Sequence, residues 1–158
     1  MDTSAYLVFA KEKLFVTFND IELLITAFTH RSYLNEHKKS VKQHNERLEF
    51  LGDAVLELVV TEYLYATYDE PEGILTNWRS SLVRTESIGA AAHKFDFEPL
   101  LRLSRGEKRG TDRAWAQISA TSFEAGIGAL YNDQGYEAAK LFSTESTLST
   151  FTPKLHTG

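Results

Sequence analysis

Apolar residues recur along the chain with the spacing of α-helices. The first amphipathic stretch has four apolar residues three or four positions apart, namely Ile21, Leu24, Ile25 and Phe28. Asn19 or Asp20 can cap this helix with a side-chain oxygen. Strict two-residue alternation, which is typical of a half-buried strand, is confined to a few residues around 14–18. The pattern therefore predicts an all-α fold.

A long helix is predicted near the middle of the chain. Asn45 can cap it, it begins at Glu46 and runs to about residue 65, and a turn containing Pro and Gly at 68–73 ends it. Helical periodicity then continues over 74–93. These residues form either one long helix or two short helices with a break near Thr85.

The second half of the chain contains a charged loop and two further helices. Residues 102–112 are rich in charge and include two glycines, which predicts a loop. Helical spacing returns over 113–131, and a last helix is predicted from about residue 136.

The C-terminal residues have a different composition. Seven of the ten residues from Ser143 to Thr152 are Ser or Thr, which are weak helix formers. At 158 residues the chain has the length of about one domain. We therefore expect one domain over residues 1–142 and a Ser/Thr-rich tail over 143–158, which is either a weak helix or the start of a linker.

Composition excludes several classes of protein. The absence of cysteine excludes disulfide scaffolds, thiolate metal sites and thiol nucleophiles. There is no signal-peptide pattern and no apolar run of the length a membrane span requires, so no membrane association and a cytoplasmic location are expected. The net charge of −5 argues against binding nucleic acid by bulk charge alone. Basic residues gather in 102–113 and acids in 46–62, which suggests a polyanion held near bound cations.

One face of the long predicted helix concentrates carboxylates. Four acids fall within an arc of about 80° when each residue advances about 100°, namely Glu46, Glu49, Asp53 and Glu57. Like charges at this spacing repel one another. Apolar residues surround the stripe, and a buried carboxylate is costly unless its pKa rises or a cation compensates it. A solvated acidic face and a cation site are the two alternatives.

Another acid, Glu124, lies on the helix predicted over 113–131, and it is the only charged residue after Arg113 on that helix. Glu124 is surrounded there by small residues that allow another helix to approach closely. Its partner is either a distant arginine, such as Arg79 or Arg84, or a divalent metal ion shared with Glu49 and Asp53 across a helix contact. An all-oxygen ligand set favours Mg²⁺, with Mn²⁺ as a substitute.

The segment NERLEFLGDAVL at 45–56 closely resembles the signature of the ribonuclease III family. Similar segments follow in family order: AFTHRSY at 27–33, the Glu72-Gly73 turn, LVRTESIGAAA at 82–92, LRLSRGE at 101–107 and the Glu124 segment at 118–133. The resemblance covers the endonuclease domain, without the C-terminal double-stranded-RNA-binding domain of most bacterial members. It implies a helical bundle that forms a homodimer. The implied activity is Mg²⁺-dependent cleavage of double-stranded RNA to 5′-phosphate and 3′-hydroxyl products.

The resemblance also implies roles for individual acids. Glu49, Asp53 and Glu124 match the metal-binding carboxylates of the family. Glu46 matches the additional catalytic acid at the start of the signature. Glu72 and Glu107 match two accessory acids, with a role in metal binding or in dimer organisation.

Other positions have a structural or binding interpretation. Phe50 falls where the family inserts an aromatic side chain into a socket on the partner, and its alternative is an ordinary core residue. His30 and Arg31 are interpreted as packing and helix-terminus residues. Three residues of the charged loop are candidates for phosphate contacts, with a solvated loop as the alternative: Arg105, Lys108 and Arg109.

One catalytic position departs from the family pattern. The family has Asp, or sometimes Asn, three residues before the Glu, and this chain has Thr121. A neutral Thr binds Mg²⁺ only through its hydroxyl or an intervening water, so weaker metal binding and reduced activity are expected. The alternative function is a catalytically impaired ribonuclease III fold that binds structured RNA or a ribonucleoprotein.

Overall fold

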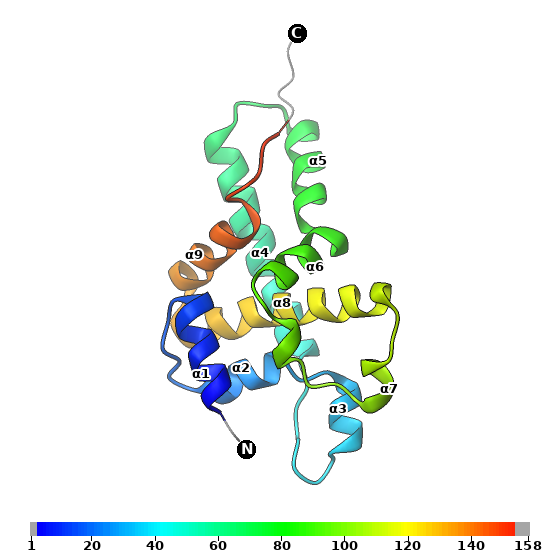
Figure 1. Ribbon diagram of the computed structural model, residues 1–158. Helices are drawn as coiled ribbons and strands as arrows, with labels where there is room; N and C mark the ends of the chain where they lie inside the picture. Colours follow the sequence, from blue (N-terminus) through cyan, green and yellow to red (C-terminus); the bar gives the residue numbers. More distant parts are fainter. Residues whose placement is uncertain (1–2, 154–158) are drawn as a thin grey trace.

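A computed structural model describes residues 3–153, and they form a helical bundle without β-strands (Figure 1). The helical elements, in chain order, are α1 Ser4–Phe9, the π-helix η1 Ala10–Leu14, α2 Ile21–Ala27, α3 Arg31–Glu36, α4 Glu46–Thr67, α5 Glu72–Val83, α6 Thr85–Lys94, the 3-10 helix η2 Glu98–Leu100, α7 Arg105–Lys108, α8 Asp112–Gln134 and α9 Tyr136–Thr147. The predicted all-α fold is confirmed. No helix within the described residues is long and apolar enough to span a membrane.

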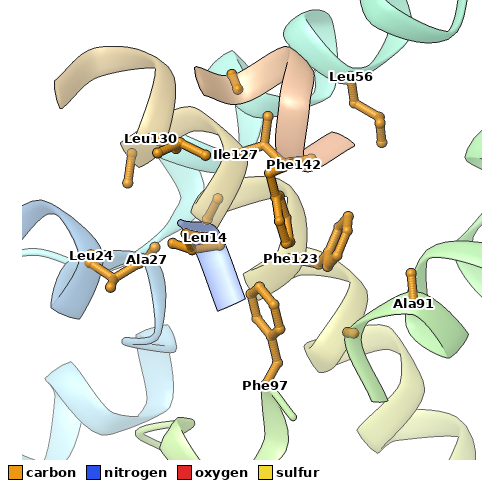
Figure 2. Close-up of a cluster of buried hydrophobic side chains, with 14 of the residues drawn as sticks. Leu14, Leu24, Ala27, Leu56, Ala91, Phe97, Phe123, Ile127, Leu130 and Phe142 are labelled. Atoms are coloured by element: carbon orange, nitrogen blue, oxygen red, sulfur yellow. The ribbon is translucent and has the colours of Figure 1, made fainter. Parts of the chain in front are cut away.

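Helix α8 forms the centre of the bundle and contacts α2, α4, α6 and α9. In Figure 1 it runs across the middle of the molecule, with α4 passing behind it. Its buried side carries Phe123, whose ring lies 5.2 Å from Phe97 and 5.4 Å from Phe142, measured between centroids. Figure 2 shows these three rings facing one another in the core. Burial of this cluster fixes α8 relative to the helices around it.

Glycines allow α4 and α8 to approach closely. A Cβ atom on Gly52 would collide with the backbone carbonyl of Glu124, and one on Gly128 would collide with the carbonyl of Leu48. The two backbones therefore touch where side chains would otherwise separate them. The crossing brings Asp53, the neighbour of Gly52, to the side of Glu124.

The predicted helix boundaries agree with the structure at several points. Asp20 caps α2, and its Oδ1 accepts a hydrogen bond from the backbone N–H of Glu22 at 3.1 Å. The segment 74–93 divides into two helices at Arg84, whose backbone is extended. Of the two alternatives, the structure therefore has two short helices with a break beside Thr85.

Asn45 has a different role from the predicted one. It occupies the N-cap position of α4, but its side chain makes no capping bond. Instead its amide donates to the carbonyl oxygen of Ala27 at 3.3 Å, which ties α4 to the end of α2. A tertiary contact has taken the place of a local one.

Two segments are more helical than the sequence pattern predicted. Residues 4–14 form α1 and η1, and Tyr6 and Phe9 pack on Phe28 at centroid distances of 5.6 and 5.3 Å. Within the predicted loop at 102–112, Ser104 caps the short helix α7 by accepting a bond from the N–H of Glu107 at 3.1 Å.

Helix α9 ends at Thr147, five residues beyond the boundary expected after residue 142. The hydroxyls of Ser146 and Thr147 donate to carbonyls one turn earlier, at 2.7 and 2.5 Å, so these polar residues are satisfied inside the helix. Beyond the helix, Phe151 packs edge-on against Tyr68 and Trp78. The part of the expected tail at 154–158 lies outside the described residues.

Candidate functional site

Acidic side chains from α4 and α8 meet at the glycine crossing. Glu49, Asp53 and Glu57 occupy successive turns of α4, and Glu124 faces them from α8. Asp53 is exposed, whereas Glu49, Glu57 and Glu124 are half-buried, so the cluster is open to solvent on one side. We call Glu49, Asp53, Glu57 and Glu124 the acidic cluster.

The environment of Glu124 disfavours its charged form. Burial raises the pKa of Glu124 to about 9, with further contributions from a hydrogen bond to Asp53 and from the charges of Asp53, Glu49 and Glu57. Two carboxyl groups can share such a bond only when one of them holds a proton. At neutral pH and without a cation, Glu124 is therefore protonated.

No basic side chain in residues 3–153 forms an ion pair with Glu49, Asp53 or Glu124. Both arginines considered from the sequence have other partners. Arg79 Nε lies 3.7 Å from Glu57 Oε1, and Arg84 Nε lies 3.8 Å from Glu86 Oε2. The hypothesis that either arginine satisfies Glu124 is therefore wrong.

The chemistry of the donor set fits a hard divalent cation. Glu49, Asp53 and Glu124 offer only oxygen ligands, as Mg²⁺ and Mn²⁺ prefer. A cation would also relieve the repulsion and burial that now hold a proton on Glu124. Across the described part of the chain, no three acidic or histidine side chains already enclose a metal position. Within the described residues, Glu49, Asp53 and Glu124 therefore lie near one another without a basic partner, but they do not surround an ion position.

Glu46 differs from the acidic cluster in having a close ion pair of its own. Its Oε2 lies 2.7 Å from Arg31 Nη2 and 3.3 Å from His44 Nδ1. The carboxylates that act on Glu124 are those of Asp53, Glu49 and Glu57. The four acids of the predicted stripe therefore divide into Glu46, which is closely paired at the start of α4, and three whose charges act on Glu124, of which Glu57 has a longer pair with Arg79.

Thr121 lies one turn before Glu124 on α8 and is half-buried. Its hydroxyl adds no charge to the site. The α8 side of the crossing therefore contributes a single carboxyl group.

The two accessory acids are not among the carboxylates that act on Glu124. Glu72 begins α5 and lines a surface pocket of about 700 Å³ with Leu64 and Arg79, toward the C-terminal end of α4. Arg79 of this pocket is also the partner of Glu57, so Glu72 lies beyond the Glu57 end of the acidic stripe. Glu107, on α7, is instead close enough to His30 to influence its pKa.

His30 caps α3, as interpreted from the sequence. Its Nδ1 accepts a hydrogen bond from the backbone N–H of Ser32 at 3.1 Å and lies 2.7 Å from the Ser32 hydroxyl. Burial lowers the pKa of His30, and the charges of Glu107 and Glu46 oppose this effect. A neutral ring with an unprotonated Nδ1 is the form that caps the helix.

The charged residues of α7 belong to a larger basic surface. Helices α3 and α7 lie side by side, because the N–H of Ser104 donates to Ser32 Oγ at 2.9 Å and that of Arg105 donates to Glu36 Oε2 at 3.3 Å (Figure 1). The loop after α3 adds three exposed lysines. Together these exposed residues form what we call the basic lobe: Arg31, Lys38, Lys39, Lys42, Arg105, Lys108 and Arg109. The lysines were missed, although three in five positions was an available signal.

Phe50 is a surface residue, so the core alternative is wrong. Its relative exposure is 83%, and Leu58 and Tyr65 on the same helix are 51% and 81% exposed. A surface groove of about 460 Å³ adjoins them, lined by Leu51, Ala54, Val55, Leu58, Glu62, Tyr131 and Tyr136. We call Phe50, Leu58, Tyr65 and this groove the apolar face.

The all-helical domain brings carboxyl groups from two helices together at an open crossing, and within residues 3–153 Glu49, Asp53 and Glu124 have no basic partner there. Comparison with known proteins identifies its relatives. The family described as Ribonuclease-III-like matches residues 20–151. The chain belongs to this family.

Two curated relatives are both named Ribonuclease 3. The one from Streptococcus sanguinis (strain SK36) is 48% identical over 132 residues, which are 83% of this chain and 57% of the relative. The one from Bacillus cereus (strain G9842) is 46% identical over 155 residues, 98% of this chain and 61% of the relative. The chain thus spans about three-fifths of the length of these relatives.

A solved structure supports the fold assignment. The nuclease domain of ribonuclease III from Campylobacter jejuni superposes with a TM-score of 0.80 at 36% sequence identity, covering 90% of this chain and 96% of that one. That structure is described as flexible in a region involved in its dimer formation.

Proposed function

We propose that this chain is the catalytic domain of a divalent-metal-dependent endoribonuclease that cleaves double-stranded RNA to 5′-phosphate and 3′-hydroxyl products. The observation that carries the proposal is the meeting of Glu124 with Asp53 and Glu49, without a counter-cation, at the crossing of α4 and α8. Membership of the ribonuclease III-like family supports the reaction type.

Glu49, Asp53 and Glu124 would hold Mg²⁺, or Mn²⁺ in its place. The cation, when bound, supplies Lewis-acid stabilisation of the phosphate and lowers the pKa of its bound water. Glu124 must release its proton to bind the cation, so affinity is expected to rise with pH. Glu46, fixed by Arg31 and His44, would act at the rim of the same site.

Roles for the two accessory acids, Glu72 and Glu107, follow from the residues around each of them. Glu107 lies with Glu46 around His30 and would organise the rim of the site. Glu72 lies beyond the opposite end of the acidic stripe, so a role in dimer organisation is better supported than one at this metal.

The basic lobe would contact the phosphates of the RNA. It reaches the start of α4, where Arg31 of the lobe pairs with Glu46, three residues before Glu49 of the acidic cluster. A local gathering of positive charge would favour binding of a polyanion by a protein whose net charge is −5. Contacts to phosphates and 2′-hydroxyls recognise A-form RNA by its shape, so no base specificity is implied.

The active form would be a homodimer in the cytoplasm, with one site for each RNA strand. The apolar face on α4 leaves Phe50 and Tyr65 more than 80% exposed, which favours burial against a second copy. The Campylobacter jejuni nuclease domain, with its region involved in dimer formation, supports this assembly. In this proposal the endonuclease domain extends through α9.

Thr121 favours a second candidate function. A site with one carboxylate fewer than the family pattern is suited to a protein that binds structured RNA or a ribonucleoprotein and cleaves it poorly. If the chain is an endoribonuclease, removal of the Glu124 carboxylate should abolish cleavage. If it is an RNA-binding protein, the same change should leave RNA binding intact.

Cleavage of a long double-stranded RNA in Mg²⁺ or Mn²⁺ tests both functions. The unmodified protein is expected to cleave, and Glu124→Gln to lose more than about 100-fold, because removing a direct ligand exceeds the 10–100-fold cost of losing an outer contact. Thr121→Asp is expected to cleave about 10-fold faster. Glu86→Gln, on the surface of α6, is the control and should cleave normally.

Cleavage that survives Glu124→Gln unchanged would contradict the assignment of the site. Cleavage seen only in Thr121→Asp would instead support the RNA-binding function, with an intact scaffold and an impaired site.

A further inference from the structure

Glu57 is an acid of the cluster that the family resemblance does not assign to the site. It lies one turn after Asp53 on α4, and its side chain is 47% exposed. Its charge acts on Glu124 in the same direction as those of Asp53 and Glu49. The carboxylate is therefore near enough to contribute to the electrostatics of the crossing.

Arg79 holds Glu57 in position from the neighbouring helix α5. Its Nη1 donates to Thr61 Oγ1 at 3.0 Å, and Thr61 Oγ1 in turn donates to the backbone carbonyl of Glu57 at 2.7 Å. Arg79 and Thr61 thus link the turn of α4 at residues 57–61 to α5 by hydrogen bonds. The backbone turn that carries Glu57 is thereby tied to α5.

The ion pair with Arg79 leaves the charge of Glu57 largely available. The closest approach is 3.7 Å, against 2.7 Å for Glu46 and Arg31, and both partners are partly exposed to water. Pairs of this kind are weak. The carboxylate of Glu57 is therefore only weakly paired with Arg79, whereas that of Glu46 is closely paired with Arg31.

On this basis, and resting on the proposed metal-dependent function, we propose that Glu57 supplies the negative charge that Thr121 does not. It would accept hydrogen bonds from the water shell of the cation held by Glu49, Asp53 and Glu124. Mg²⁺ keeps several of its waters when bound to protein, and carboxylates around those waters tune metal affinity. Glu57 is thus a positioning residue that acts through water.

Titration of the full chain with Mn²⁺ alone, followed by calorimetry, tests this role without RNA. Glu57→Gln is expected to weaken Mn²⁺ binding about 10-fold. The matched control is Glu86→Gln, which removes the same charge from an arginine pair of nearly equal length, 3.8 Å against 3.7 Å, but on α6. Its affinity should stay within about twofold of the unmodified protein, as expected for a surface charge screened by salt.

A double-mutant cycle with Thr121→Asp separates a specific role from a general loss of charge. Thr121→Asp should tighten Mn²⁺ binding, and in that background Glu57→Gln should cost less than about threefold, because coupled residues are not additive. Equal losses in both backgrounds, or equal affinities of Glu57→Gln and Glu86→Gln, would overturn the proposal.

Glu124→Gln distinguishes failure of this inference from failure of the proposed function. If it abolishes Mn²⁺ binding while Glu57→Gln does not weaken it, the metal site stands and only the role of Glu57 is wrong. If Glu124→Gln leaves binding unchanged, the metal site and the role of Glu57 both fall.

Discussion

Glu124 is a carboxyl group that the fold keeps partly out of water and next to other carboxylates. Its pKa of about 9, against an ordinary value of 4.5, means that the folded chain holds a proton which the unfolded chain releases. Such a residue weakens the fold at neutral pH unless a cation compensates it. A site of this kind lowers the stability of the fold but favours binding of a cation.

The pH dependence of stability follows from this shift. Between pH 4.5 and about 9 the folded state binds more protons at Glu124 than the unfolded state, so its contribution to stability falls as pH rises through that window. In cation-free buffer, the melting temperature of the unmodified protein should therefore decline from pH 5 to pH 9 relative to Glu124→Gln. Added Mn²⁺ should oppose the decline, because it binds only the folded chain. Parallel pH curves for the two proteins would contradict the assignment.

At the scale of elements, the site depends on how closely α4 and α8 cross. Gly52 and Gly128 remove the side chains that would separate the helices, and the backbone of Glu124 lies directly against Gly52. Asp53 and Glu124 meet because of this contact. The glycines therefore have a functional effect although they carry no chemistry.

Gly52→Ala tests the crossing. The added methyl must displace the carbonyl of Glu124, and overpacking of this kind costs about 1–3 kcal/mol, more than the gain in helix propensity from Gly to Ala. We expect the free energy of unfolding in urea to fall by about 2 kcal/mol, and Mn²⁺ affinity to fall with it. The control is Gly73→Ala on α5, where a Cβ meets nothing within 4 Å. Equal free energies of unfolding for Gly52→Ala and Gly73→Ala would show that α4 and α8 can move apart without loss of stability.

Across the whole molecule, three separate surfaces are proposed to bind the cation, the RNA and a second copy of the chain. The acidic cluster is open to solvent, the basic lobe contacts Glu46 at the start of α4, and the apolar face lies on the exposed side of the same helix. One long helix thus carries or contacts the surfaces proposed for cation binding, RNA binding and assembly. Mutations on the apolar face should affect assembly before they affect folding.

Phe50→Ala is expected to weaken the homodimer by about 10–100-fold, because burial of an aromatic side chain at an interface contributes about 2 kcal/mol or more. Sedimentation equilibrium measures the change in the monomer–dimer constant. Val8→Ala, an exposed apolar residue on α1, is the control and should associate normally. The interface assignment would be wrong if both variants associated like the unmodified protein.

The sequence by itself determined the features that depend on neighbouring residues. The 3.6-residue period predicted α2, α4, α5, α6, α8 and α9, because amphipathic periodicity is a local property. The acidic stripe and the isolated Glu124 followed from the same spacing. Family resemblance then connected them, and it identified Thr121 as the unusual position.

The tertiary structure alone decided which groups became partners. Asn45 bonds Ala27 instead of capping its helix, and α9 continues through a Ser/Thr-rich segment whose hydroxyls bond within the helix. Glu46 is paired with Arg31, whereas Glu57 remains near Glu124. Local spacing places side chains on a face. Contacts between distant segments, and the burial that accompanies them, determine which of those side chains stay charged, paired or exposed.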